Sequence, residues 1–67
     1  MQISARNQLR GTVTAVTLGG VMAEVVVQVG EHRIVSVVTR ASAEELGLAE
    51  GDEVTAIIKS TEIMLAK

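Results

Sequence analysis

Apolar and polar residues alternate along most of this chain, and the alternation predicts a protein built mainly of β-strands. A period of two residues is typical of a strand that buries one face. The pattern covers residues 9–17, 21–29, 32–39 and 54–59, and a short apolar run predicts a fifth strand at 63–65. Glycine-containing pairs punctuate the pattern as turns at Gly19-Gly20, Gly30-Glu31 and Gly51-Asp52. The pattern therefore predicts an all-β chain with five short strands.

The same alternation assigns a face to each side chain. The members of one face in the first three strands are Leu9, Gly11, Val13 and Ala15; Val21, Ala23, Val25, Val27 and Val29; and Ile34, Ser36 and Val38, which lie opposite Val35, Val37 and Thr39. Large aliphatic residues also lie on the opposite faces, as at Val26, Ile57 and Met64. Because a small barrel has only one inside, we expect a subunit interface to cover this second apolar face. Scattered surface valines are the alternative.

The period changes after residue 39, where a short helix is expected. Ser42-Ala43-Glu44-Glu45 has the pattern of a capping box, in which Ser42 caps the helix and Glu45 reaches back to it. Gly47 is placed to end the helix in the left-handed conformation. Five strands with one helix between the third and fourth is the order of a small OB-like barrel. A plain antiparallel meander is the alternative architecture.

Length and composition narrow the possibilities for assembly and location. The 67 residues are enough for one small domain, expected to span residues 1–67, and such domains are marginally stable alone. The sequence has no cysteine and one histidine, so oligomerisation is the remaining means of stabilising it. No apolar run reaches the roughly 18 residues of a membrane span, and no secretion signal is evident. We therefore expect a cytoplasmic protein with no membrane partner.

Several functional classes are disfavoured by charge and residue types. The net charge of −2 gives no basic footprint for a nucleic-acid backbone, and no aromatic ring is present to stack bases. The acidic residues around the expected helix are interpreted as a solvated face, because no catalytic arrangement accompanies them. The sequence therefore predicts a non-enzyme that does not bind nucleic acid, with an OB-type nucleic-acid binder as the disfavoured alternative.

Three polar segments supply the chemistry that holds a small oxyanion. They are Ser4-Ala5-Arg6-Asn7, Thr39-Arg40-Ala41-Ser42 and Lys59-Ser60-Thr61. A tetrahedral oxyanion presents only acceptors, so it is bound by hydroxyls, backbone N–H groups and one or two cations. Each segment also has a plainer interpretation, respectively as a solvated N-terminal arm, a helix cap and a turn after a strand. Together they predict an anion binder whose selectivity is local and does not depend on overall charge.

The same segments resemble the Mop domain of molbindins. The resemblance rests on four segments. They are Ile3-Ser4-Ala5-Arg6-Asn7-Gln8-Leu9, Ser42-Ala43-Glu44-Glu45-Leu46-Gly47-Leu48, Gly51-Asp52-Glu53-Val54-Thr55-Ala56 and Ile58-Lys59-Ser60-Thr61-Glu62. The resemblance covers essentially the whole chain, in order. It implies an OB-like five-stranded barrel assembled as a homohexamer, a trimer of dimers.

The resemblance also implies a ligand and its site. The ligand is molybdate or tungstate, bound for storage or homeostasis in the cytoplasm, so that the metal is held as an oxyanion and not by side chains directly. One subunit is expected to offer Ser4, Ala5, Arg6, Lys59 and Ser60, and its neighbour Thr39 and Ser42. A second anion site is expected around Gly19, Gly20 and Val21. No organic cofactor is expected, since nothing aromatic is present to stack a pterin.

One alternative from a different class remains open. The chain is also compatible with a structural or interaction module that mediates oligomer assembly without binding an anion. A thermal shift with molybdate distinguishes the two, because a ligand that prefers the native state stabilises it.

Overall fold

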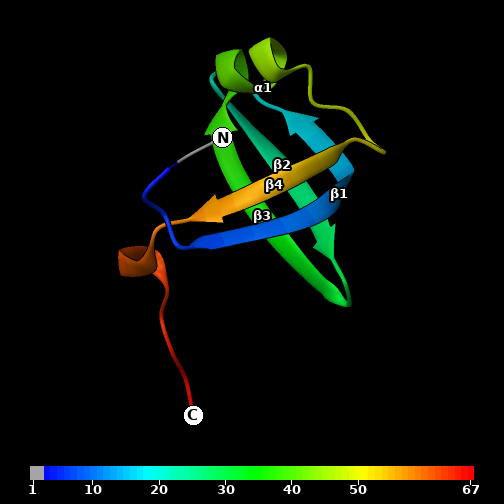
Figure 1. The fold of residues 1–67 in the computed structure, drawn as a ribbon. Helices are drawn as coiled ribbons and strands as arrows, with labels where there is room; N and C mark the ends of the chain where they lie inside the picture. The colour runs from blue at the N-terminus through cyan, green and yellow to red at the C-terminus, as the bar shows by residue number, and fades with distance from the viewer. Residues whose placement is uncertain (1–2) are drawn as a thin grey trace.

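A curled antiparallel sheet forms the body of the molecule. The computed structural model describes residues 3–67. Its strands run in the spatial order β3-β2-β1-β4, with α1 between β3 and β4 in sequence (Figure 1). The elements are β1 (Asn7–Leu18), β2 (Met22–Val29), β3 (His32–Thr39), α1 (Arg40–Leu46), β4 (Glu53–Ile58) and the 3₁₀ helix η1 (Ser60–Glu62). The predicted OB-like, mostly β arrangement with one short helix after the third strand is confirmed.

The long strand β1 joins the two halves of the sheet through a β-bulge. Its first half pairs with β4 and its second half with β2, and the register shifts between Val13 and Ala15. A bulge inserts one unpaired residue and bends the strand. Beyond it, Val16 pairs with Val25 on the core face. The prediction that Ala15 continues the face of Val13 is therefore wrong, because the bulge reverses the alternation.

The core is small and made almost entirely of valine. Val13, Val25 and Val27 form its buried centre, surrounded by partly buried aliphatic residues from β1, β2, β3, β4 and the loop after α1. Ala43 of α1 is only 2% exposed, so the helix lies closely on the sheet. Ala23, Val25 and Val27 of β2 share one buried face, as predicted, and Ile34 and Val38 of β3 are half-buried on the core side. Val21, predicted on the same face as Ala23, is instead 75% exposed, because it lies in the turn before β2 begins.

The sheet does not close into a five-stranded barrel. After β4 the chain turns through η1, and residues 63–67 form no strand. They run away from the body of the molecule (Figure 1), and Met64 and Leu65 are 93% and 94% exposed. The predicted fifth strand at Ile63-Met64-Leu65 is thus wrong for the isolated chain. A strand needs a partner edge for its backbone groups, and η1 directs this segment away from both edges.

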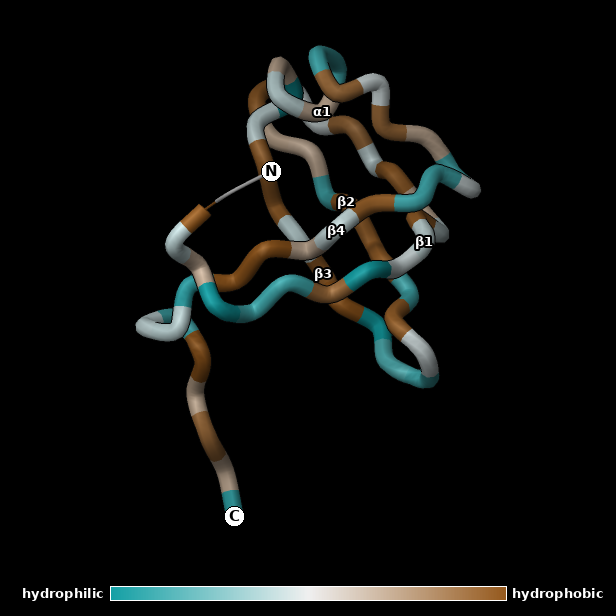
Figure 2. The backbone as a smooth tube through the Cα atoms, in the orientation of Figure 1, coloured by the Kyte–Doolittle hydropathy of each residue, from teal (hydrophilic) through white to brown (hydrophobic). Residues whose placement is uncertain are grey.

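Large aliphatic side chains also lie on the outside, as predicted. Val35 and Val37 of β3 are 57% and 61% exposed, and Ile57 of β4 is 42% exposed. Val26, expected on the same outer side, is instead buried beside the bulge, where the Thr14 hydroxyl donates to its carbonyl. Figure 2 shows hydrophobic positions along β3 and, separately, in the C-terminal segment. Across residues 3–67, the structure contains no helix with the length and apolar character of a membrane span.

Candidate oxyanion-binding site

The N-terminal arm before β1 and the segment after β4 lie at the same end of the paired strands β1 and β4. The antiparallel pairing of β1 with β4 places Asn7 opposite Ile58, and the Asn7 side-chain amide donates to the Ile58 carbonyl at 3.2 Å. Ser4-Ala5-Arg6 therefore enters the sheet where Lys59-Ser60 leaves it. The structure thus brings together two predicted donor segments that are more than fifty residues apart in the sequence.

This first group of donors, Ser4 to Arg6 with Lys59 and Ser60, is open to solvent. Arg6 and Lys59 are exposed, and within residues 3–67 neither takes part in an ion pair. Ser60 begins η1, whose first N–H groups have no partner inside a helix. Two cations, two hydroxyls and free backbone N–H groups are therefore available to an anion at this end of the β1–β4 pair.

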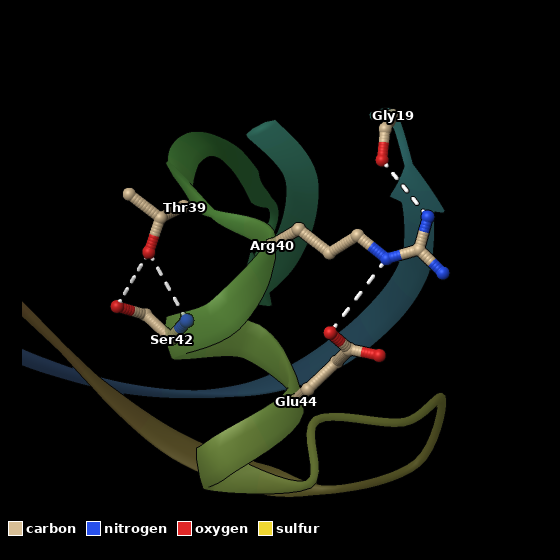
Figure 3. Close-up of polar contacts among 5 residues, drawn as sticks. All are labelled: Gly19, Thr39, Arg40, Ser42 and Glu44. Atoms are coloured by element: carbon tan, nitrogen blue, oxygen red, sulfur yellow. Dashed lines mark hydrogen bonds and ion pairs between the residues drawn. The ribbon is translucent and has the colours of Figure 1, made fainter. Parts of the chain in front are cut away.

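The third donor segment lies at the start of α1, but its cap differs from the prediction. Thr39 is the N-cap, and its hydroxyl oxygen accepts from the Ser42 N–H at 3.0 Å (Figure 3). The capping box centred on Ser42 is wrong, because α1 begins at Arg40 and Ser42 already lies within its first turn. The predicted left-handed end at Gly47 is confirmed, with φ 63° and ψ 36°.

The hydroxyl groups of Thr39 and Ser42 at the start of α1 are hydrogen-bonded to each other. The Thr39 hydroxyl donates to the Ser42 hydroxyl oxygen at 2.8 Å. The hydrogen of the Ser42 hydroxyl therefore remains free to be donated elsewhere. Both residues are exposed, so the donor faces solvent.

Arg40 joins the Gly19–Val21 turn to this helix start. Its backbone N–H donates to the Val21 carbonyl at 2.7 Å, and its guanidinium donates to the Gly19 carbonyl at 3.1 Å (Figure 3). The same guanidinium lies 3.6 Å from the Glu44 carboxylate. Residues predicted to form a second site thus lie beside Thr39 and Ser42. Sequence reasoning missed this role of Arg40. The four-residue spacing between Arg40 and Glu44 could have indicated their ion pair, but not the contact with Gly19.

The donors of one chain form two groups at opposite ends of β1. Asn7 marks the end beside Lys59, whereas Leu18 pairs with Ala23 at the other end, where Met22 also pairs with Thr39. The helix α1 packs on β2 and β3. Within residues 3–67, no hydrogen bond or ion pair links the two groups. In the same part of the chain, no set of three His, Asp or Glu side chains gathers as metal ligands.

The fold and these donor groups define a small, mostly β domain with exposed hydrogen-bond donors and cations at its two ends. The TOBE domain family model matches residues 3–65, and the chain belongs to this family. It is 52% identical over 66 residues to molybdenum-pterin-binding protein 3 of Clostridium pasteurianum, an alignment that covers 97% of each chain.

Solved structures of molybdate-binding proteins have the same fold. A molybdate-binding protein from Sporomusa ovata is 40% identical, with a TM-score of 0.96 and complete coverage of both chains. The cytoplasmic molybdate-binding protein ModG, in a form with molybdate bound, is 41% identical with a TM-score of 0.84. That match covers 90% of this chain and 43% of ModG.

Proposed function

We propose that this chain binds molybdate or tungstate in the cytoplasm, at interfaces between its own subunits, and so stores the oxyanion or buffers its concentration. A relative named as a molybdenum-pterin-binding protein and two solved molybdate-binding proteins, one of them described as cytoplasmic, support the ligand and the location. The chain acts as a single binding domain over residues 1–67 and not as an enzyme. It needs no organic cofactor.

The observation that carries the proposal is the division of the donors between the two ends of β1. One subunit supplies the first group, Ser4, Ala5, Arg6, Lys59 and Ser60. Its neighbour supplies the Ser42 hydroxyl and the N–H groups at the start of α1, with Thr39 holding Ser42 in place. Each chain carries one half of a site at each end, so association of copies completes the sites by symmetry.

The chemistry of the combined site fits a doubly charged tetrahedral anion. Arg6 and Lys59 supply two positive charges, and charge-assisted hydrogen bonds to an oxyanion are about twice as strong as neutral ones. Hydroxyl and backbone donors complete the shell without the need for proton transfer. Because these donors are local, the net charge of −2 on the chain does not oppose binding decisively.

A second, smaller site is proposed at Gly19, Gly20 and Val21. Glycines let an anion approach the backbone closely, and the chain at Gly20 leaves open space where a side chain would lie. The Arg40 guanidinium fixes this turn through the Gly19 carbonyl. The assembly proposed for the whole protein is a homohexamer, a trimer of dimers.

The sharing of each site between chains has a direct test in mixed oligomers. Lys59→Ala removes a positive charge from the first group, and Ser42→Ala removes a hydroxyl from the group at the start of α1. Each variant alone is expected to bind molybdate at least tenfold more weakly, as measured by titration calorimetry. Unfolding the two variants together and refolding them as an equal mixture should restore about a quarter of the sites to parental affinity, because random pairing unites intact halves at that frequency. A site formed within one chain would give no restoration. Arg33→Ala, which removes an exposed cation outside both groups, serves as the matched control.

The alternative function is an interaction module that assembles without an anion. The exposed Val35 and Val37 favour it, since they form an apolar strand face that suits a protein partner. This alternative predicts that saturating molybdate leaves the melting temperature unchanged. The proposed function predicts a rise in melting temperature that grows with molybdate concentration.

A further inference from the structure

The turn between β1 and β2, residues 19–21, carries backbone N–H groups that have no partner. Within residues 3–67, neither the Gly20 N–H nor the Val21 N–H takes part in a hydrogen bond. Val21 is 75% exposed, and a Cβ atom at Gly20 would meet nothing within 4 Å. Successive backbone N–H groups in a turn can bind an anion. An anion can therefore approach these donors without displacing a side chain.

The Arg40 side chain lies beside this turn with most of its donors uncommitted. A guanidinium carries several N–H donors, and Nη1 of Arg40 uses one of them to donate to the Gly19 carbonyl at 3.1 Å (Figure 3). Within residues 3–67, the other terminal nitrogen, Nη2, has no hydrogen-bond or ion-pair partner. The side chain is 42% exposed. A fixed positive charge with free donors is therefore available next to the N–H groups of the turn.

Glu44 pairs with the same guanidinium, but only weakly. Its carboxylate oxygen lies 3.6 Å from Arg40 Nε, which is an ion pair and too long for a good hydrogen bond (Figure 3). The Glu44 side chain is 59% exposed. Exposed ion pairs are weak because water and salt compete with them. A doubly charged anion can therefore replace Glu44 as the partner of Arg40.

We infer that Arg40 contacts the anion in the proposed second site and that Glu44 weakens this site by competing for the guanidinium. The inference deepens the proposed function, because it rests on anion binding at the Gly19–Val21 turn and names the residues that set its affinity. The ligand class is a tetrahedral dianion, which accepts hydrogen bonds and donates none. The parallel N–H donors of a guanidinium fit the oxygen atoms of such an anion.

Main-chain hydrogen bonds close this turn in addition to the Arg40 side chain. The Arg40 backbone N–H donates to the Val21 carbonyl at 2.7 Å, and the Gly19 N–H donates to the Met22 carbonyl at 2.7 Å. Neither bond involves a side chain. Substitutions at Arg40 and Glu44 are therefore expected to leave the turn closed and to change mainly the charge beside it.

The sign of the Glu44 effect separates competition for the guanidinium from a purely structural role. If Glu44 only supports the turn through Arg40, then removing its charge should weaken binding at the turn. Since Glu44 competes with the anion in our account, Glu44→Gln should strengthen binding about threefold, the scale of an exposed ion pair. Arg40→Gln should weaken binding at the same site about tenfold, the loss expected for one charge-assisted hydrogen bond.

Titration calorimetry with molybdate, on the assembled full chain of each variant, measures these affinities. Lys59→Ala identifies the sites that use the first donor group, so the effects of Arg40→Gln and Glu44→Gln are followed in the remaining class of sites. Glu45→Gln is the matched control and should keep the parental affinity. It removes the same charge from an exposed residue of α1 that pairs with no cation within residues 3–67.

A double variant tests whether Glu44 acts through the guanidinium. In an Arg40→Gln background, Glu44→Gln should have no further effect. Weaker or unchanged binding in Glu44→Gln alone, or equal strengthening in Glu45→Gln, would overturn the inference. If Arg40→Gln weakens only the sites that Lys59→Ala weakens, or none, this inference is wrong and the proposed function stands. A parental chain that binds no molybdate removes the proposed function, and this inference with it.

Discussion

Gly11 of β1 lies against residues 27–29 of β2, with no room for a side chain. A Cβ atom at this position would meet the Gln28 carbonyl oxygen at 2.5 Å and a methyl group of Val27 at 2.7 Å. Both distances are shorter than van der Waals contact, and a carbonyl oxygen of a paired strand cannot move aside easily. The absence of a side chain at Gly11 is thus a requirement of the sheet.

We predict that Gly11→Ala lowers the free energy of unfolding by about 1–3 kcal/mol, the usual cost of overpacking a tight site. Urea denaturation followed by far-ultraviolet circular dichroism measures it. Gly20→Ala is the control, because a Cβ there meets nothing within 4 Å and the backbone lacks a positive φ. Equal destabilisation by both substitutions would show that close approach at Gly11 is not the cause.

A second residue-scale prediction concerns the cap of α1. Thr39→Ala should lower the free energy of unfolding by about 1 kcal/mol, because the Ser42 N–H loses its acceptor. Ser42→Ala removes only the hydroxyl that Thr39 donates to, so a smaller loss is expected. Denaturation without molybdate separates this effect from ligand binding. A larger loss for Ser42→Ala would restore Ser42 as the cap.

At the scale of elements, the end of α1 depends on one left-handed residue. Gly47 has φ 63°, and its N–H donates to the carbonyls of Ala43 and Glu44. We predict that Gly47→Ala costs about 1 kcal/mol of unfolding free energy, because a Cβ disfavours this conformation. Gly47→Asn should cost less, since asparagine tolerates it better. Thermal melts of the two variants compare them, and identical melting temperatures would contradict the argument.

The strands and the helix could be predicted because their signals are local. A two-residue period identified β2 and β3 almost to the residue, and Gly47 signalled the end of the helix. The bulge at Val13 and Ala15 could not be predicted, since it depends on how β1 pairs with β2. The prediction of a fifth strand at residues 63–65 was wrong for a similar reason. Its residues have strand character, but a strand also needs an edge, and sequence pattern does not say where that edge lies.

In the candidate site, too, the local features could be predicted from the sequence and the long-range contacts could not. Its hydroxyls and cations could be found from the sequence, because each donor segment is short and continuous. Their grouping could not, since the pairing of Asn7 with Ile58 joins the two ends of the chain. The role of Arg40 in fixing the Gly19 turn also depends on contacts made only after folding.

At the scale of the whole molecule, an exposed apolar C-terminal segment and two separated half-sites both indicate that a single chain is incomplete. Exposed aliphatic residues on β3 and in the C-terminal segment are costly for a free monomer and useful in an assembly. We predict that the melting temperature rises with protein concentration over a hundredfold range, because association stabilises only the folded state. A melting temperature independent of concentration would indicate a monomer that is stable alone.

The central claim is that molybdate binds between subunits of an assembly of this chain. Native mass spectrometry of the purified protein, with molybdate and with sulfate as the control, tests it most directly. The account predicts a species of six chains that gains several molybdate ions and gains no sulfate. A single chain, or an assembly that gains no molybdate, would contradict it.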